Sequence, residues 1–224
     1  MRFLSETRVL ARHELRREGA RRWLRLEVSG LAETRPGQTV LFLEDRHSPR
    51  CRIATVETVA GETTALVARF EADDRVPEIG AGLTVWSNET PAVVVGAGSL
   101  IVTTPAFLYR VAPFALLGAD VLVEADGMNL WDELRRHIEA GRDWTSVFLA
   151  LEPARLQAFA DTFPEADPYL YANMDMSCGI GACRSCHVNV SDNKDGEASC
   201  RVGPWFALRR VDLVRLQFSS APFL

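Results

Sequence analysis

Ser177-Cys178-Gly179-Ile180-Gly181-Ala182-Cys183-Arg184-Ser185-Cys186 contains three of the five cysteines of this chain, and Cys200 follows after 13 further residues. The spacing Cys-x4-Cys-x2-Cys with a distant fourth cysteine is typical of plant-type [2Fe–2S] clusters, which four thiolates hold. The small residues between the cysteines let the backbone wrap closely around a cluster and direct amide hydrogens at its sulfurs. We therefore predict that Cys178, Cys183, Cys186 and Cys200 bind a [2Fe–2S] cluster and that the chain transfers single electrons.

Zinc is the main alternative for these cysteines. Cys183 and Cys186 could bind zinc with Cys200 or with His187, because thiolate and imidazole also suit that ion. Structural zinc sites usually combine two short ligand pairs, whereas this chain has one, so the cluster is favoured. A disulfide framework is not favoured, because the cysteine count is odd and no export signal is present. Cys51 is predicted to remain a thiol away from the site, and His187 to be a solvated neighbour.

The composition is that of an ordinary globular protein. Of the 224 residues, 47% are hydrophobic, which is ample material for a core. The formal net charge of -5 argues against a general nucleic-acid-binding protein, which would normally be basic. Arginines do cluster near the N-terminus, and we expect them on the solvated face of a strand pair, with a partner-docking patch as the alternative. They are Arg12, Arg16, Arg17, Arg21, Arg22 and Arg25.

Neither a leader nor a membrane span is predicted. Residues Met1–Glu6 contain no apolar h-region, so no secretory signal is expected. The uncharged segment from Thr90 to Tyr109 is long enough to suggest a span. Its prolines, glycines and threonines better fit short buried strands with turns. We therefore expect a cytoplasmic protein.

Residues 1–90 are predicted to form a small antiparallel β-barrel. Polar and apolar residues alternate in Trp23–Val28 and Thr63–Phe70, which is typical of strands. Turn residues such as Pro36-Gly37 and Ala60-Gly61 separate such segments. Several short strands at this spacing indicate a barrel.

Residues 91–165 are predicted to form an α/β domain with a parallel sheet, because strands now alternate with helices. Val93–Val95 and Leu100–Val102 are fully apolar, as buried strands are. A helical run follows from Pro105, and further strands are expected at Asp120–Glu124 and Ser146–Leu151.

Two helices of this domain carry recognisable end signals. Asn129 is predicted to cap one, with Asp132 three residues on and Gly141 closing it. Pro153 is well placed in the first turn of the other. Leu156, Phe159 and Phe163 are expected to form the inner face of that second helix. Residues 166–224 then form the cysteine module, so the predicted fold class is a multidomain α+β protein.

The order of barrel, α/β sheet and four-cysteine module resembles a known family. The chain is similar to the iron–sulfur electron-transfer subunit of NAD-dependent dihydroorotate dehydrogenase, within the ferredoxin-reductase-like group. The segment Cys178–Cys186 carries this resemblance together with Cys200-Arg201-Val202-Gly203-Pro204-Trp205-Phe206, which matches the family's Cys-x-x-Gly-Pro-x-Phe ending. In that family an acidic residue often occupies the position that Val202 occupies in this chain. The resemblance implies that NADH reduces an FAD, that the FAD passes electrons singly to the cluster, and that the cluster reduces a flavin in a partner dehydrogenase.

The family's flavin motif, Arg-x-x-Ser/Thr, can be laid on Arg52-Ile53-Ala54-Thr55. The resemblance would place Arg52 at the pyrophosphate and Thr55 near the isoalloxazine. Residues three apart face opposite sides of a regular strand unless a bulge realigns them. In addition, Glu71-Ala72-Asp73-Asp74 puts carboxylates where a glycine-rich phosphate turn is expected. FAD binding therefore stays open, and we predict that the chain alone does not bind FAD tightly.

The nicotinamide nucleotide site of the family is not evident. Ile101-Val102-Thr103-Thr104-Pro105 runs from strand to helix without the glycine-rich loop that such proteins carry there. Thr103 and Thr104 would block the close backbone approach that phosphates need. Gly96-Ala97-Gly98 lies before the strand and is predicted to be a simple turn. The sequence thus argues against NAD(P) binding.

These features predict an electron-transfer subunit that works in a hetero-oligomer with a flavin-dependent dehydrogenase. A single cluster stores one electron, whereas metabolite dehydrogenations transfer pairs, so a two-electron cofactor must lie nearby. Gly203–Phe206, Phe218 and the tail Ala221–Leu224 are a predicted docking surface; the alternative is that Trp205 and Phe206 cover the cluster within their own domain. An FAD-containing NAD(P)H-oxidising reductase subunit and a zinc-bearing or structural adaptor are the other functional hypotheses. The sequence shows no catalytic constellation.

Overall fold

The computed structural model describes residues 2–31, 33–44, 51–70, 74–87, 95–115, 117–172, 174 and 182–218. The chain forms two compact units. The first comprises Met1–Val94, Met176–Cys183 and Cys200–Val202, and the second Val95–Asp175, Arg184–Ser199 and Gly203–Leu224. In these described ranges, no helix is long and apolar enough to cross a membrane.

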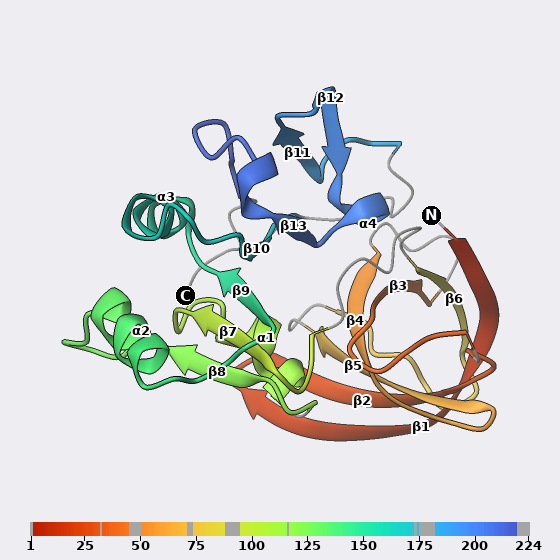
Figure 1. Cartoon of the computed structure of the whole chain (residues 1–224). Coiled ribbons are helices and arrows are strands. Elements are labelled where there is room, and N and C mark those ends of the chain that lie inside the picture. The colour runs from red at the N-terminus through yellow and green to blue at the C-terminus, as the bar shows by residue number, and fades with distance from the viewer. Residues whose placement is uncertain are drawn as a thin grey trace. The chain divides into compact units, whose positions relative to one another are not determined.

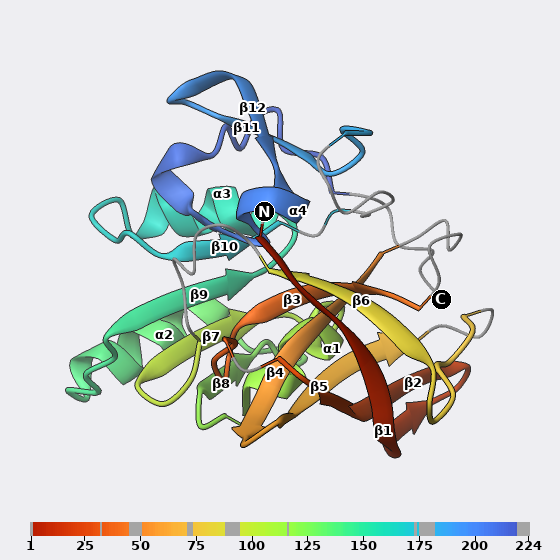
Figure 2. The same ribbon diagram turned by 90° about the vertical axis from the view of Figure 1, so that its right-hand side faces the viewer.

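The first unit contains a closed antiparallel barrel, which confirms the prediction for the N-terminal part. Its strands follow the order β1-β2-β5-β4-β3-β6 around the barrel (Figure 2). The sequence forms strands because apolar side chains alternate with polar ones: in β2, Leu24, Leu26 and Val28 are buried, whereas Arg25 and Glu27 are half-buried. The strands are β1 (Arg2–Glu18), β2 (Arg21–Ser29), β3 (Thr39–Leu43), β4 (Arg52–Ala60), β5 (Thr63–Phe70) and β6 (Gly82–Ser87).

The barrel is filled by large side chains such as Phe42, Phe70 and Leu66, which are fully buried. Three of the N-terminal arginines lie at or near its surface and bind acidic or carbonyl groups. Arg17 binds Glu14, and Arg12 donates to the carbonyl oxygen of Pro77. Arg25 binds both Glu27 and Glu57. These pairs agree with the expected solvated face.

The second unit contains a five-stranded sheet in the order β13-β10-β9-β7-β8 (Figure 1). The strands β7 (Ser99–Thr103), β8 (Asp120–Val123), β9 (Ser146–Ala150) and β10 (Tyr169–Tyr171) are parallel, and β13 (Trp205–Ala207) runs antiparallel to β10. Every residue of β7 is buried, as its apolar sequence predicts. The predicted parallel sheet is therefore confirmed. Of the predicted strand Val93–Val95, only Val95 lies within the described residues.

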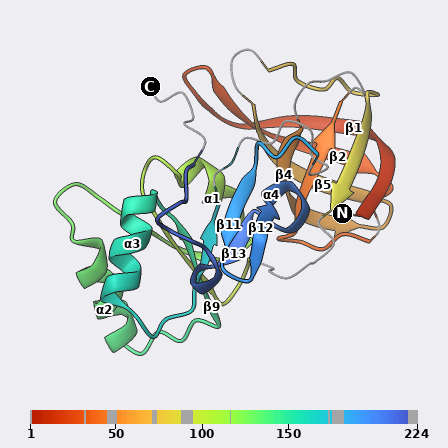
Figure 3. The ribbon, with the colours of Figure 1, turned by 90° about the horizontal axis from the view of Figure 1, so that it is seen from above.

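Three helices flank this sheet: α1 (Leu108–Ala115), α2 (Leu130–Glu139) and α3 (Pro153–Thr162). Asn129 caps α2, since its Oδ1 accepts hydrogen bonds from the amides of Trp131 at 3.1 Å and Asp132 at 3.4 Å. Pro153 starts α3 as predicted, and Leu156 and Phe159 on that helix are buried. The Trp131 ring lies 5.7 Å from that of Phe159, so α2 and α3 pack side by side (Figure 3).

Candidate metal centre

A β-hairpin connects the third and fourth cysteines of the motif. Its strands, β11 (His187–Val190) and β12 (Asn193–Ala198), pair antiparallel with His187 opposite Ala198. The amide of Ser199 donates to the carbonyl oxygen of Cys186 at 2.8 Å, which extends this ladder by one step. The hairpin therefore begins directly after Cys186 and ends at the residue before Ser199. Cys200 follows as the second residue of the short helix α4 (Ser199–Val202).

The three described cysteines of the motif differ in exposure. Cys186 and Cys200 are buried, with exposed fractions of 1% and 0%, whereas Cys183 is exposed. All three carry thiols rather than disulfides. Cys178 lies outside the described residues. Within the ranges that the structure describes, no three His, Cys, Asp or Glu side chains gather as a metal site. The available donors are soft sulfur atoms, which suit iron–sulfur clusters and zinc.

Gly203 closes α4 at a position where a side chain does not fit. Its amide donates to the carbonyl oxygen of Ser199 at 2.8 Å. A Cβ at Gly203 would lie 2.5 Å from Ser199 Oγ, 2.6 Å from Phe206 Cε2 and 2.9 Å from Ser199 O. The glycine of the Cys-x-x-Gly-Pro-x-Phe ending is therefore explained by this close approach, since the backbone of α4 and the ring of Phe206 leave no space for a methyl group.

The aromatic residues after Gly203 pack inside the second unit. Trp205 is 7% exposed and Phe206 3%. The Trp205 ring lies 5.0 Å from Tyr171, 5.1 Å from Phe148 and 5.9 Å from Phe114. Both residues therefore belong to the core of the second unit and not to an exposed docking surface. The alternative, that they cover the cluster, stays a prediction.

The other parts of the predicted docking surface are only partly described. Phe218 is half-buried, and its ring lies 6.0 Å from that of Phe107. The tail Ala221–Leu224 lies outside the described residues, so its predicted role in docking stays a prediction.

The structure also describes His187 and Cys51, which are not among the cluster ligands that the sequence predicts. His187 is half-buried, and its ring covers the cross-strand Gly196, where a Cβ would lie 2.3 Å from both Cε1 and Nε2. The imidazole is thus packed on the hairpin, which differs from the solvated side chain expected, because the missing Cβ of Gly196 leaves room for the ring. Cys51 is 8% exposed and forms no disulfide with the other described cysteines.

The candidate flavin residues Arg52 and Thr55 are not brought together. Strand β4 pairs with β3 in regular register from Arg52 opposite Phe42 to Thr55 opposite Thr39, and its irregularity comes later, between Val56 and Thr58. Because Thr55 follows Arg52 at a spacing of three in a regular strand, the two side chains leave opposite faces of the strand. Thr55 is buried.

The Arg52 guanidinium already has a negatively charged partner from its own chain. Its Nη1 lies 2.5 Å from Asp74 Oδ2, and its Cζ lies 5.0 Å from the centre of the Phe70 ring. The exposed fractions are 21% for Arg52 and 13% for Asp74, so the pair is largely buried. An FAD pyrophosphate would have to displace Asp74 and would meet its charge. The residues present at Arg52 therefore do not fit the pyrophosphate of FAD.

The carboxyl edge of the parallel sheet, where nucleotides bind in such folds, is bridged by the chain's own groups. The strand order reverses between β7 and β9, and this switch point is the usual ligand crevice. There Thr103 Oγ1 donates to the carbonyl oxygen of Ala150 at 2.9 Å, and Thr104 Oγ1 donates to Glu152 Oε1 at 3.0 Å. Glu152 stands at the start of α3, where its carboxylate would repel a phosphate.

Two neighbouring features also argue against a nucleotide site at this edge of the sheet. Arg155 Nη2 binds Glu124 Oε1 at 2.5 Å, which joins α3 to the residue after β8. The segment Gly96–Ser99 is a turn, with the Ser99 amide donating to the Gly96 carbonyl at 3.0 Å and Gly98 at φ +81°. The glycines therefore turn the chain before β7, as predicted, and offer no phosphate loop after it.

Sequence reasoning missed a cluster of charged residues on the hairpin. Arg210 binds Asp192 and Glu197, which lie between the third and fourth cysteines of the motif, whereas Arg210 lies ten residues after the fourth. No spacing rule connects residues 13 to 18 positions apart in a loop-rich segment. Only the way the chain folds back after β13 brings them together.

The fold belongs to the ferredoxin-reductase-like class. The chain is similar to a structure reported as "Insights into flavin-based electron bifurcation via the NADH-dependent reduced ferredoxin-NADP oxidoreductase structure", with a TM-score of 0.61, 15% identity, and coverage of 95% of this chain and 91% of that one. At this identity the likeness concerns the fold.

The cysteine module is similar to a more specific group. Residues 173–212 match the family described as the iron–sulfur cluster binding domain of dihydroorotate dehydrogenase B. The electron transfer subunit of dihydroorotate dehydrogenase B (NAD(+)) from Listeria monocytogenes serovar 1/2a is 41% identical over 64 residues, which are 28% of this chain and 24% of that protein. The subunit of that name from Listeria welshimeri is 38% identical over 61 residues, 27% of this chain and 24% of that one. The chain thus matches about a quarter of the length of these curated relatives. The predicted resemblance is confirmed.

Proposed function

We propose that this chain is an electron-transfer subunit that holds a [2Fe–2S] cluster on Cys178, Cys183, Cys186 and Cys200. It would relay single electrons to or from a flavin-dependent dehydrogenase, of the dihydroorotate dehydrogenase type. The observation that carries the proposal is the hydrogen-bonded hairpin, which begins after Cys186 and returns the chain to Ser199, directly before Cys200. This hairpin lies inside the segment that matches an iron–sulfur cluster binding domain.

The exposures of the cysteines suit this role. A bound [2Fe–2S] cluster supplies one-electron redox chemistry, with a potential set by its surroundings. Cys186 and Cys200 are buried, so these two sulfur ligands would be shielded from water by the surrounding protein. Cys183 is exposed, so its side of the site would be open to a redox partner.

The partner and the domain organisation are proposals as well. Because dehydrogenation moves electron pairs and one cluster stores a single electron, a flavin on a second subunit completes the pathway. We propose that the chain works in a cytoplasmic hetero-oligomer. We also propose a division into residues 1–90, 91–165 and 166–224, in which the first two parts support the cluster module. The pairing of Arg52 with Asp74 and the bridged carboxyl edge favour a relay without tightly bound FAD or NAD(P) on this chain.

The test is anaerobic reconstitution of the purified chain with iron and sulfide, followed by iron and sulfide analysis and visible and EPR spectra. The expected result is two irons and two sulfides per chain. Replacing Cys178, Cys183, Cys186 or Cys200 by Ser should abolish or strongly change the spectrum. The matched control is Cys51→Ser, which should leave it unchanged, since Cys51 lies more than a hundred residues before the motif in the sequence and has no part in its spacing. A colourless protein with one bound zinc would instead support the adaptor hypothesis, and loss of iron in Cys51→Ser would overturn the ligand assignment.

A further inference from the structure

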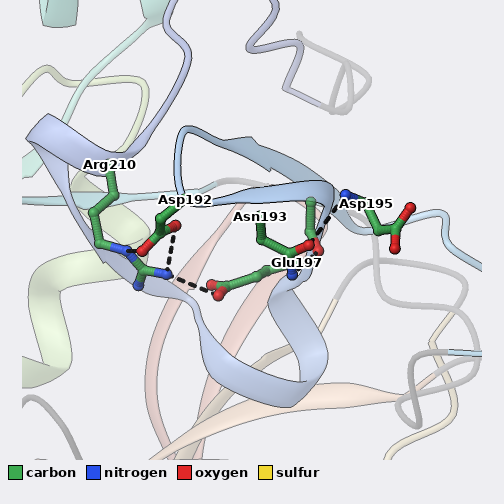
Figure 4. Close-up of polar contacts among 6 residues, drawn as sticks. Asp192, Asn193, Asp195, Glu197 and Arg210 are labelled. Atoms are coloured by element: carbon green, nitrogen blue, oxygen red, sulfur yellow. Dashed lines mark hydrogen bonds and ion pairs between the residues drawn. The ribbon is translucent and has the colours of Figure 1, made fainter.

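Arg210 links two carboxylates of the cysteine hairpin (Figure 4). Its Nε lies 2.8 Å from Asp192 Oδ2, and its Nη2 lies 3.0 Å from Asp192 Oδ1 and 2.8 Å from Glu197 Oε1. Asp192 stands in the turn between β11 and β12, and Glu197 stands on β12, three residues before Cys200. The planar guanidinium fork binds Asp192 through two parallel hydrogen bonds, which fixes direction as well as distance.

The backbone around Arg210 joins the same hairpin. The Ser191 amide donates to the Arg210 carbonyl at 2.7 Å, and the Asp212 amide donates to the Asn189 carbonyl at 3.0 Å. Val190 and Val211 form an antiparallel bridge between these two bonds. Arg210 is the last residue of the 3-10 helix η1 (Leu208–Arg210). The end of η1 and the residues that follow it therefore lie along the edge of β11.

Asn193, the first residue of β12, forms hydrogen bonds that fix the backbone directly after the hairpin turn. Its Nδ2 donates to the Gly196 carbonyl at 3.0 Å, and its Oδ1 accepts from the Asp195 amide at 3.1 Å (Figure 4). Gly196 has φ +62°, a conformation that favours glycine. The tip of the hairpin is thus fixed locally, and the fork of Arg210 fixes its orientation on the rest of the second unit.

The charges of the cluster act together. The hydrogen bond from Arg210 is the main cause that holds the pKa of Asp192 below its ordinary value. The same bond, followed by that to Glu197, raises the pKa of Arg210. Asp192 is exposed and Arg210 is 37% exposed, and such surface pairs contribute little to global stability. The arrangement is therefore better suited to orient the hairpin than to stabilise the fold.

We propose that Arg210 is a positioning residue for the candidate cluster: by clamping Asp192 and Glu197 it orients the hairpin whose two ends lead into Cys186 and Cys200. The inference rests on the proposed function, because it needs a cluster on these cysteines. Groups outside the ligand set commonly orient metal ligands, and their loss costs affinity and shifts the spectrum even where the ligands remain.

The chain offers a matched control in the neighbouring arginine. Arg209 is 74% exposed and binds Asp167, which lies outside the hairpin. Arg210→Gln and Arg209→Gln remove the same charge from adjacent residues, so a general electrostatic effect would appear in both. Arg210→Lys keeps the charge but not the fork. Asp192→Asn with Glu197→Gln removes the two acceptors while Arg210 stays, which covers the case that Arg210→Gln does not fold.

The experiment compares the reconstituted full chain and these variants by EPR, by visible circular dichroism and by the rate of iron loss to a chelator. Arg210→Gln and the double variant should show altered spectra and iron loss about 10-fold faster than the wild type, with Arg210→Lys in between. Arg209→Gln should match the wild type. Identical spectra and rates for Arg210→Gln, the double variant and Arg209→Gln would overturn the inference while leaving the proposed function intact. A wild-type chain that takes up no iron would overturn the proposed function and the inference with it.

Discussion

At the scale of single residues, Gly203 occupies a space that a methyl group cannot enter, and this makes a prediction about stability. Gly203→Ala should lower the free energy of unfolding by about 1–3 kcal/mol, because its Cβ would lie 2.5 Å from Ser199 Oγ and 2.6 Å from the Phe206 ring. The measurement is urea unfolding of the purified chain. The matched control is Gly82→Ala at the start of β6, where a Cβ would meet nothing within 4 Å. Equal effects at the two sites would contradict the packing argument.

The pair of Arg52 and Asp74 leads to a second prediction at this scale. The purified wild-type chain should release no stoichiometric FAD on heat denaturation, because the carboxylate of Asp74 already binds the arginine that would meet the pyrophosphate. Asp74→Asn removes that charge and should raise the affinity for added FAD by about tenfold, or 1.4 kcal/mol. Fluorescence titration with FAD measures this. The control is the double variant Arg52→Gln with Asp74→Asn, which should bind no better than the wild type. Stoichiometric FAD in the wild type would show that the pair does not block the site.

At the scale of secondary-structure elements, the ion pairs that Arg210 forms with Asp192 and Glu197 of the β11–β12 hairpin predict that stability depends on pH. Since folding lowers the pKa of Asp192, its contribution to stability is present above the ordinary carboxylate pKa and is lost as the pH falls through the lowered folded value. The difference in unfolding free energy between the wild type and Arg210→Gln should therefore be small, because the pair is exposed, and should be largest near neutral pH and smaller in acid. Urea unfolding at a series of pH values measures it. A difference that stays constant into strong acid would exclude ionised Asp192 as the partner that matters.

The carboxyl edge of the β7–β9 pair gives a prediction about nucleotides. Isothermal calorimetry with NADH and with NADPH should show no binding at micromolar concentrations. The physical reason is that Thr103 and Thr104 bridge the crevice and that Glu152 places a carboxylate where a phosphate would approach the start of α3. A ferredoxin-reductase-like protein with an intact nucleotide site is a suitable positive control. A micromolar dissociation constant for either nucleotide would mean that these bridges open.

At the scale of the whole molecule, a one-electron carrier without its own two-electron cofactor should work only in a complex. We expect this chain to co-purify from its native source with a flavoprotein and to turn over a metabolite only in that complex. Deleting Ala221–Leu224 should weaken the association and leave the cluster spectrum unchanged. The size of the complex and its flavin content measure the result. A native preparation that runs as a monomer and still turns over a metabolite would contradict the relay model.

Local sequence patterns predicted much of the fold correctly. The alternation in Trp23–Val28 and Thr63–Phe70 identified barrel strands, and Asn129 and Pro153 marked the starts of α2 and α3. These features depend on neighbours within a few residues, so the sequence carries them directly. By contrast, β10 and β13 were not predicted. Each has three residues, and β13 joins the sheet by pairing with a strand more than thirty positions earlier.

The sequence by itself was enough to predict the iron–sulfur chemistry proposed for this centre, because cysteines at Cys-x4-Cys-x2-Cys spacing need no tertiary information to be recognised. The tertiary structure decided which residues pack near the described cysteines. It also decided whether the flavin and nucleotide sites that the family resemblance implies are open to a ligand. Burial placed Trp205 and Phe206 in the core of the sheet, and packing made Gly203 necessary. Folding also paired Arg52 with Asp74, Thr104 with Glu152, and Arg210 with Asp192 and Glu197. Such pairs depend on the register of strands and on the path of loops, which are set by the packing of the whole unit and leave no periodic signal in the sequence.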